Sequence, residues 1–524
     1  MEQHGKSLAA AHKLTSARGP DQLLPSLAAN EAVLIETCNL LTKAVTANRR
    51  ITPAGEWLLD NFYLIEEQIR TAKRHLPKDY SRELPRLAGG ASAGLPRVYD
   101  IASEIIAHAD GRVDPETLSR FVTAYQTITQ VTLGELWAIP IMLRLALIQN
   151  VRRIAIEIAT DTADRVLASG WADQMRTTAQ SDPKSLILVI ADMARSDPPM
   201  TAPFVSELAR RLQGRGPALA LPLTWIEQRL FEFHLTIEQL VQSGHEQQAA
   251  KQVSISNSIG SLRCLDATDW RKFVENTSVV EQELREDPAG IYRNMNFSTR
   301  DRYRHAVERL AKDSVASEAQ IARAAIRLAQ EGANRGNADP RTSHVGFYLI
   351  DAGRPTLQRA LDPPRTIAAS MRGLASRFPT FVYIGAIVTL TGLFTASLLA
   401  MAHDGGASLT MLAVMLVISL LATSQLAVAL VNWFVTLLVT PHPLPRMDFS
   451  SGIAAESRAL VVVPAMLTSP RGIEELAEAL EVRFLANQDA NLHFALLTDF
   501  VDADEKTMPR TPRCCSSRAT GSAR

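Results

Sequence analysis

The chain has 524 residues, of which 46% are hydrophobic, a proportion that is ordinary for a globular protein. Lysine and arginine together number 55, as do aspartate and glutamate, so the formal net charge is zero. Because nucleic-acid-binding proteins usually carry a basic excess or a basic stripe, this balance argues against nucleic acid as a partner.

The beginning of the chain lacks the apolar stretch that a cleaved signal peptide contains. We expect residues 1–21 to be disordered, and any insertion into a membrane to depend on an internal segment. The spacing of the four cysteines fits neither a metal site nor a disulfide framework, which indicates reduced thiols. They are Cys38, Cys264, Cys514 and Cys515.

Residues 22–335 read as a succession of helices, because apolar side chains recur at helical spacing and almost no alternating stretch is present. Thr52 and Asp114 each precede a proline, a pattern that is typical of a helix beginning at that proline. We predict an all-α cytoplasmic region, divided into two subdomains near residues 181–183 or 214–217.

One segment of this region, Leu136–Ile158, is apolar enough to resemble a membrane span. It contains four charged side chains, and each would cost about 2.5–3.5 kcal/mol at the centre of a bilayer. We therefore interpret it as a buried helix of a bundle. The four residues are Arg144, Arg152, Arg153 and Glu157.

Near the end of the helical region, Ser298 and Asp301 have the spacing of a capping box, which predicts a helix over Thr299–Lys312. A dense group of basic and aromatic residues surrounds this start. The group could hold a phosphate or an anionic lipid headgroup, but contacts within the helical region are the preferred interpretation. Its members are Tyr292, Arg293, Arg300, Arg302 and Arg304.

Residues 336–377 have the composition of a linker, rich in arginine, proline and glycine, and two long uncharged segments follow. We predict transmembrane helices at residues 378–403 and 409–440, because about 20 apolar residues cross roughly 30 Å of hydrocarbon. Gln425 is the strongest polar group in the central part of the second helix, and we expect it to face the first helix. The lipid bilayer is therefore an expected partner.

Basic residues near the ends of these two helices predict their orientation. Arginines precede the first helix and follow the second, whereas the connection over residues 402–408 carries only a histidine and an aspartate. Both large flanks, and with them both termini, should be cytoplasmic. The same short connection argues against a receptor with an external domain. The arginines are Arg365, Arg372, Arg377, Arg446 and Arg458.

After the second span, the pattern changes to that of an α/β domain. A strand over Ala459–Pro464, an amphipathic helix over Gly472–Leu485 and a strand over Leu492–Leu497 predict one βαβ unit of a parallel sheet. Ligands of such sheets bind at the carboxyl ends of the strands. Pro464 and Asp499 occupy these ends.

From about Thr507 onwards the sequence has no apolar periodicity. A parallel sheet of only two strands would leave both faces and an edge open. We therefore interpret residues 459–506 as a truncated domain and residues 507–524 as an aberrant tail. A frameshift, a sequencing error or a natural sequence would each explain that tail.

Several long stretches closely resemble the cyclic β-1,2-glucan synthase family. They are spread over most of residues 50–506. Chance similarity rarely gives several long helical stretches in the same order along two chains. They include VTLGELWAIPIMLRLALIQNVRR, DPAGIYRNMNFSTRDRYR, VGFYLIDAGR and LHFALLTDF. The stretches are Trp57–Pro77, Leu95–Asp110, Ala124–Arg153, Asp287–Arg304, Val345–Arg354 and Ala459–Asp504.

The resemblance implies a large, multi-pass protein of the bacterial inner membrane with a cytoplasmic glycosyltransferase domain of the GT-A type. Such an enzyme would use UDP-glucose, with Mg²⁺ or Mn²⁺, to extend a β-1,2-glucan that is later cyclised. The resemblance also implies nucleotide contacts at the two strand ends. These would be made by Pro464, Ala465, Met466 and Asp499.

The resemblance leads us to expect a metal-binding D-x-D, a catalytic-base acid and a Q/R-x-x-R-W string further along, and none of these can be located. Asp502-Ala503-Asp504 has the letters of the metal motif but follows the second strand too closely, and we interpret it as a solvated loop. We therefore expect no catalytic residue and no metal site in this chain. We interpret the chain as an inactive N-terminal fragment of a synthase. The alternative is a non-enzymatic helical membrane module that scaffolds or regulates an intact synthase. Self-association is left open.

Overall fold

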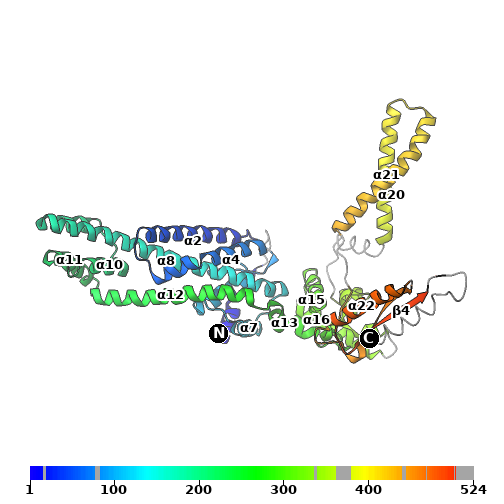
Figure 1. Ribbon diagram of the computed structural model, residues 1–524, viewed down its shortest axis with the longest axis horizontal. Coiled ribbons are helices and arrows are strands. Elements are labelled where there is room, and N and C mark those ends of the chain that lie inside the picture. Colours follow the sequence, from blue (N-terminus) through cyan, green and yellow to red (C-terminus); the bar gives the residue numbers. More distant parts are fainter. Residues whose placement is uncertain are drawn as a thin grey trace. The chain divides into compact units, whose positions relative to one another are not determined.

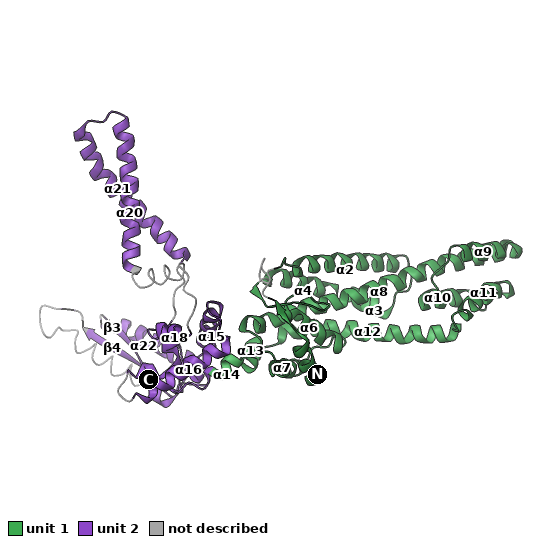
Figure 2. Ribbon diagram, turned by 180° about the vertical axis from the view of Figure 1, so that it is seen from behind, with its two compact units in different colours: residues 1–283 green, residues 284–524 purple. Residues whose placement is uncertain are grey.

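The chain forms two compact units, Met1–Glu283 and Leu284–Arg524, which are coloured separately in Figure 2. The boundary falls inside the predicted helical region, so that region is shared between the two units. The computed structural model describes residues 1–15, 19–76, 83–335, 339–361, 379–438, 444–467, 469–500 and 502.

The first unit is built mainly of helices, joined by turns and by a small antiparallel ribbon (Figure 1). Its long helices are α2 (Leu23–Thr46), α8 (Leu133–Ser181) and α12 (Ile237–Ala267). The shorter ones are α1 (Glu2–Ala11), α3 (Pro53–Asp60), α4 (Phe62–His75), α6 (Arg97–His108), α7 (Pro115–Gln126), α9 (Leu186–Arg195), α10 (Ala202–Leu212), α11 (Ala220–Phe231), α13 (Trp270–Thr277) and α14 (Val279–Leu284). The ribbon is β1 (Leu14–Thr15) with β2 (Arg86–Leu87), and the 3-10 turns are η1 (Pro183–Ser185) and η2 (Pro217–Leu219).

The central element of this unit is α8, which is 49 residues long and packs against α2, α6, α10 and α12. It begins with a capping box between Thr132 and Glu135. Most side chains of Leu136–Ile158 are buried within the unit, which confirms the prediction of a buried bundle helix. Arg144, whose side chain is 8% exposed, pairs with Asp266 of α12 at 2.7 Å, so its charge is compensated inside the bundle.

A buried ion pair fixes the start of α8 against α6. The side chains of Arg97 and Glu135 are 1% and 0% exposed, and Arg97 donates to both carboxylate oxygens at 2.8 and 2.5 Å. One of these oxygens also accepts the backbone N–H of Thr132 at 2.9 Å. Glu135 therefore caps the start of α8 and also neutralises the buried Arg97.

The N-terminus forms a helix, α1, that packs against α7. The fit is close, because a Cβ atom added to Gly5 would lie 3.0 Å from the carbonyl oxygen of Phe121. Beyond the helix, His12 Nδ1 lies 2.7 Å from the hydroxyl of Tyr125. The prediction that residues 1–21 are disordered is therefore wrong for the part that the structure describes, since small and polar residues anchor it.

Neither predicted subdomain boundary divides the first unit. Residues 181–183 lie where α8 passes into η1, and residues 214–217 lie between α10 and α11. Two hydrophobic clusters exist, one centred on α6 and the first half of α8, the other on α9, α10 and α11. Because α8 and α12 contribute buried side chains to both clusters, these clusters belong to one unit.

The second unit starts with a small helical part. The N-cap of its helix α15 (Phe297–Lys312) is Asn296, whose side chain accepts the N–H of Thr299 at 3.0 Å. The predicted capping box of Ser298 and Asp301 is wrong, because the aspartate is engaged by Arg304 at 3.0 Å. The other elements are η3 (Tyr292–Asn294), α16 (Glu318–Asn334), η4 (Pro340–Ser343), α17 (Val345–Ile350) and α18 (Arg354–Ala360).

Part of the predicted linker, residues 336–377, is folded. Helices α17 and α18 pack against each other and against α16, with Val345 and Leu349 fully buried. The linker prediction is therefore wrong for residues 340–360, because a short apolar run outweighs the proline- and glycine-rich composition. Residues 362–377 lie outside the described residues.

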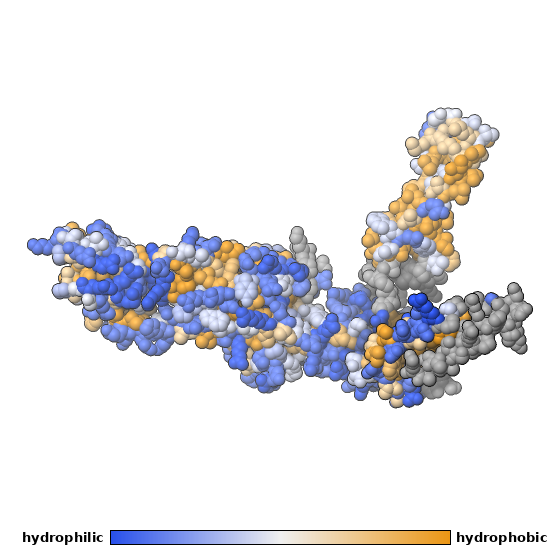
Figure 3. Space-filling view, in the orientation of Figure 1, coloured by the Kyte–Doolittle hydropathy of each residue, from blue (hydrophilic) through white to orange (hydrophobic). Residues whose placement is uncertain are grey.

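Two helices of this unit are long and apolar enough to cross a membrane. They are α20 (Pro379–Asp404) and α21 (Leu409–Leu438), which pack against each other as a hairpin and lie where the two spans were predicted. Figure 3 shows the hydrophobic side chains that cover this hairpin. Such a surface is expected to face lipid rather than water.

The two helices of the hairpin meet through polar side chains as well as apolar ones. The hydroxyls of Thr395 and Thr423 are 2.8 Å apart, and Tyr383 donates to the side-chain oxygen of Asn432 at 2.8 Å. Gln425 is exposed, so the prediction that it faces the first helix is wrong. A residue two positions after Thr423 lies roughly 200° further round the helix, on its far side.

The last described part is a strand, a helix and a strand, preceded by η5 (Ala455–Ser457). These are β3 (Ala459–Leu467), α22 (Pro470–Ala486) and β4 (Leu492–Phe500). The strands pair in parallel along their whole lengths, which confirms the predicted βαβ unit. The assignment of this unit to a GT-A fold stays a prediction.

Candidate functional site

The candidate nucleotide contacts stand at two strand ends, and the register of the sheet brings these ends together. Met466 is opposite Asp499, Ala465 is opposite Thr498, and Pro464 comes one residue earlier on β3. The four residues selected from the sequence therefore lie side by side at the carboxyl edge of the strand pair. Ligands of parallel sheets bind at such an edge.

One face of the strand pair is covered by α22. Ile473 of this helix contacts Leu467, and the rings of Phe484 and Phe494 meet edge to face with centroids 6.4 Å apart. Ile473 and Leu467 are the buried hydrophobic residues of this small contact. The face of β3 that carries Leu467 is therefore the inner face of this small layer.

Met466 and Asp499 lie on the opposite, uncovered face, because successive side chains of a strand alternate between faces. Both residues are exposed. Ala465 and Thr498 point toward α22, and the hydroxyl oxygen of Thr498 is buried without a hydrogen-bond partner among the described residues. An exposed carboxylate at a strand end can accept hydrogen bonds from N–H and hydroxyl groups of a ligand.

The N-terminus of α22 follows the carboxyl end of β3. Ser469 caps this helix, and its Oγ accepts the N–H of Gly472 at 3.2 Å. The first N–H groups of a helix and its dipole favour negatively charged groups nearby. The edge that carries Asp499 thus also offers a location where a phosphate would be stabilised.

A metal site was not expected in this chain. Within the described ranges, no group of three or more histidine, cysteine, aspartate or glutamate side chains is placed to hold a metal ion. Asp502, the first acid of the D-x-D letters, is exposed, whereas Asp504 lies outside the described residues. The interpretation of this sequence as a solvated loop stays a prediction.

The basic and aromatic group around the start of α15 makes contacts within its own unit, as preferred from the sequence. Tyr292 and Arg304 are fully buried, and Arg304 pairs with Asp301 at 3.0 Å. Arg293 donates to the carbonyl of Arg285 at 3.0 Å. These residues therefore stabilise the fold around η3 and α15.

Asp287 joins two of the stretches that resemble the synthase family. Its carboxylate accepts the N–H groups of Tyr292 and Val345 at 3.2 and 2.8 Å, and it lies 2.8 Å from His344 Nδ1. Burial raises the pKa of Asp287, but the bonds from His344 and Val345 outweigh it and hold the pKa below its usual range. The stretch that begins at residue 287 and the stretch that begins at residue 345 therefore form one structure.

The segment between α21 and β3 is attached to the same structure. Asn296 donates its backbone N–H to the carbonyl of Arg446 at 2.9 Å, and the backbone N–H of Asp448 donates to the carbonyl of Asn294 at 2.8 Å. Thr299 accepts the N–H of Arg446 through its hydroxyl at 3.0 Å. The chain that leaves the second apolar helix is thus held by η3 and the start of α15 before it enters the strand pair.

The comparisons with known proteins agree with the resemblance seen in the sequence. No family model matches the chain. Over 486 residues, the chain is 30% identical to a protein of Rhizobium meliloti (strain 1021) described as cyclic beta-(1,2)-glucan synthase NdvB. The aligned region is 92% of this chain and 17% of that protein, so the chain spans about a sixth of the length of this relative.

Proposed function

The chain is a homologue of the cyclic β-(1,2)-glucan synthases over most of its length, and we propose that it serves in the synthesis of a cyclic β-1,2-glucan. Its β3–α22–β4 unit would be the nucleotide-binding part of a GT-A-type glycosyltransferase domain that transfers glucose from UDP-glucose to a growing glucan. The observation that carries the proposal is the meeting of Pro464, Ala465, Met466 and Asp499 at one edge of a parallel strand pair in a homologue of such an enzyme.

The proposed contacts follow from the chemistry of this edge. Asp499 would accept hydrogen bonds from the uridine, and the backbone of Pro464–Met466 would border the base. The N-terminus of α22 would favour the diphosphate. Mg²⁺ or Mn²⁺ is the expected cofactor of such a transfer, but the described residues contain no acid cluster that fits it. We therefore assign the metal to no residue of this chain.

Equilibrium binding of UDP-glucose to the full chain in detergent tests the nucleotide site. Asp499→Asn keeps the size of the side chain and removes its charge, and it is expected to weaken binding roughly tenfold, the effect of one lost charge-assisted hydrogen bond. Glu478→Gln is the matched control, because Glu478 is an exposed acid on α22. Equal affinity in the two variants would remove Asp499 from the site.

We also propose that α20 and α21 cross the bacterial inner membrane with both termini in the cytoplasm. The observations behind this are their length, their apolar surface and the arginines outside them. A reporter that works only in the periplasm is expected to be active when inserted at Gly405 and silent at Gly452. Activity at Gly452 would contradict this orientation.

A second candidate function is a scaffold that acts on an intact synthase. The observation that favours it is the size of the helical unit Met1–Glu283, which is independent of the strand pair. Membranes that contain this chain alone, from a host without its own synthase, can be supplied with labelled UDP-glucose. Labelled β-1,2-glucan would refute the scaffold. No label in these membranes would support it, provided that the chain co-purifies with a full-length synthase when the two are expressed together.

A further inference from the structure

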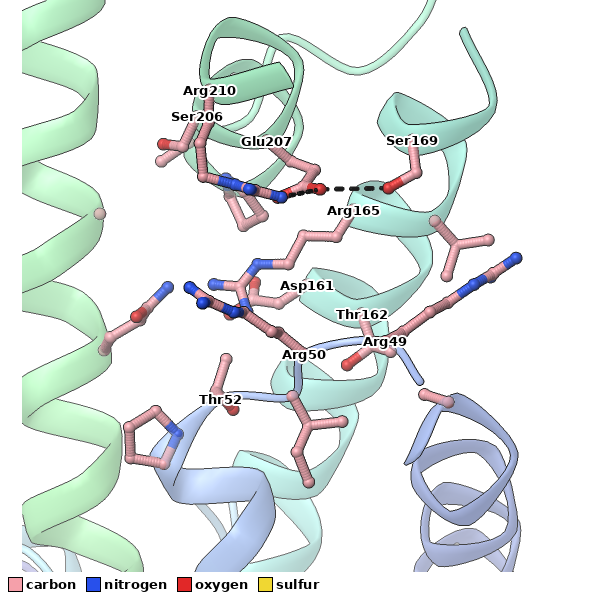
Figure 4. A pocket seen from close by; sticks show the side chains of 18 of the residues that line it. Arg49, Arg50, Thr52, Asp161, Thr162, Arg165, Ser169, Ser206, Glu207 and Arg210 are labelled. Atoms are coloured by element: carbon pink, nitrogen blue, oxygen red, sulfur yellow. Dashed lines mark hydrogen bonds and ion pairs between the residues drawn. The ribbon is translucent and has the colours of Figure 1, made fainter. Parts of the chain in front are cut away.

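A cavity of about 470 Å³ lies inside the first unit, apart from the strand pair (Figure 4). Its walls come from the turn between α2 and α3 and from α8, α10 and α12. Two acidic side chains, Asp161 and Glu207, line it together with six basic ones, which leaves an excess of four positive charges. The basic residues are Arg49, Arg50, Arg165, Arg210, Arg211 and Lys251.

The two acids are already engaged by some of these cations. Glu207 accepts from Arg210 and from Arg211, each at 2.6 Å. Asp161 accepts from Lys251 at 2.8 Å. The acids therefore do not balance the remaining arginines, and an anion from solution would find positive charge that the protein itself leaves uncompensated.

Among the described residues, three lining arginines have side chains without a hydrogen bond or an ion pair, namely Arg49, Arg50 and Arg165, and of these Arg50 and Arg165 extend into the cavity (Figure 4). Figure 4 shows both side chains extending into the same space, Arg165 from α8 and Arg50 from the turn before α3. In the part of the chain that the structure describes, neither side chain makes a hydrogen bond or an ion pair. Arg165 is half-buried, and this burial lowers its pKa although Asp161 and Glu207 act in the opposite direction. A partly desolvated cation without a partner is unfavourable until an anion joins it.

The rest of the lining indicates what kind of anion fits. It contains hydroxyl and amide side chains, such as Ser206 and Gln248, and no phenylalanine, tyrosine or tryptophan among the described residues. Apart from the imidazole of His245, such a wall offers hydrogen-bonding groups rather than rings on which a base could stack. The volume is within the usual range of about 300–1,000 Å³ for small-molecule sites, and guanidinium groups match phosphate geometry.

We propose that this cavity binds a compact, hydrophilic phosphorylated molecule with at least two negative charges, held by Arg50 and Arg165. The site belongs to the helical unit and does not depend on the proposed role in glucan synthesis. A bound anion would connect the α2–α3 turn to α8 across the cavity, and through Arg210 and Lys251 it would also involve α10 and α12. Its occupancy should therefore stabilise the unit.

Thermal unfolding of the full chain in detergent, at constant ionic strength, tests the site with inorganic pyrophosphate as the probe. Pyrophosphate is expected to raise the melting temperature of the unaltered chain, with an affinity that falls roughly tenfold in Arg165→Gln or Arg50→Gln. The matched control is Arg195→Gln on α9, because Arg195 is 78% exposed and pairs with Asp192 away from the cavity. It should respond like the unaltered chain.

The two variants also separate a ligand site from a structural role. Without pyrophosphate, Arg165→Gln is expected to melt no lower than the unaltered chain, because it removes an unpaired charge. Arg50→Gln alters an exposed residue and keeps the test valid if the other variant fails to fold. No pyrophosphate effect, or an equal effect in all variants, would overturn the proposal. So would a response only to nanodiscs that contain anionic phosphatidylglycerol, since the anion would then be a lipid headgroup.

Discussion

The helical unit Met1–Glu283 and the strand pair β3–β4 bury their apolar side chains to very different extents. In the helical unit, Leu143 and Leu147 are fully buried between neighbouring helices. In the strand pair, Leu460 and Leu497 are 61% and 65% exposed. A helix makes its backbone hydrogen bonds internally, so it needs packing partners only for its apolar faces. A parallel strand pair needs a packed layer on each of its two faces.

This difference explains where stability and ligand chemistry are found in the chain. The helical unit owes its stability to a closed core, so a polar cavity lined by Arg165 can exist inside it. The strand pair has one covered and one open face, and the open face carries Asp499. Two of the candidate nucleotide contacts, Met466 and Asp499, therefore lie on the open face, where ligands have access.

The largest effect is expected for Glu135→Ala in the helical unit. The change leaves the buried guanidinium of Arg97 without its carboxylate, which should cost about 3–5 kcal/mol. Hydrogen exchange of the full chain should show lost protection in peptides from α6 and α8. Glu116→Ala, an exposed acid in the first turn of α7, is the control and should change protection little. Equal effects would mean that the buried ion pair does not stabilise the unit.

One pair of leucine truncations measures the difference in burial between the helical unit and the strand pair. Leu143→Ala opens a cavity in a closed core and should cost about 2–5 kcal/mol. Leu497→Ala removes a side chain that is 65% exposed, and a surface change of this kind should stay within about 0.5 kcal/mol. Hydrogen exchange in α8 and in β4 measures the two costs. A large loss at Leu497 would show that another surface covers this face of the sheet.

A smaller effect is expected between the two apolar helices, where a polar pair contributes to the contact. Thr423→Val keeps the shape of the side chain and removes its bond to Thr395, at a cost of about 0.6 kcal/mol. This loss in the free energy of helix pairing can be measured by energy transfer between labels on α20 and α21 during unfolding in mixed micelles. Ser424→Ala is the control, because the hydroxyl of Ser424 donates to the carbonyl of Leu421 within α21. Its removal should not change the pairing of the two helices.

Another small effect is a pH dependence of stability at His305. Hydrogen bonds that the ring of His305 donates to Asp301 and Glu308 raise the pKa of His305 to about 9 from an ordinary 6.5. Stabilisation by the protonated ring is therefore complete below pH 6.5 and lost as the pH rises through about 9. Because this side chain is 41% exposed, the contribution should stay under about 1 kcal/mol. His305→Gln should lower stability only below pH 9, and an equal loss at higher pH would contradict the ion pairs.

Sequence patterns predicted those features that depend on neighbouring residues. The caps at Thr52 and Asp114, the two apolar helices and the strand–helix–strand unit are found as expected. Patterns failed where the outcome depended on distant contacts or on the choice between adjacent residues, as for Asn296, which caps a helix assigned to Ser298.

The residues of the charged cavity show the same limit. Arg50 and Arg165 are more than a hundred positions apart in the sequence, and no local pattern connects them. They share a cavity because α8 is long enough to contact α2, α3 and α10, which brings Arg165 close to the α2–α3 turn that carries Arg50. Arginines can be recognised in a sequence, but whether nearby acids pair with them depends on the fold.

The proposed nucleotide site is tested most directly by locating bound UDP-glucose on the full chain. A light-activated azido analogue of UDP-glucose can be cross-linked in detergent, and the labelled peptides identified by mass spectrometry. We predict label in peptides from residues 459–472 or 492–502, and we expect excess unlabelled UDP-glucose to remove it. Label confined to the first unit, or label that UDP-glucose does not displace, would contradict a nucleotide site at the ends of β3 and β4.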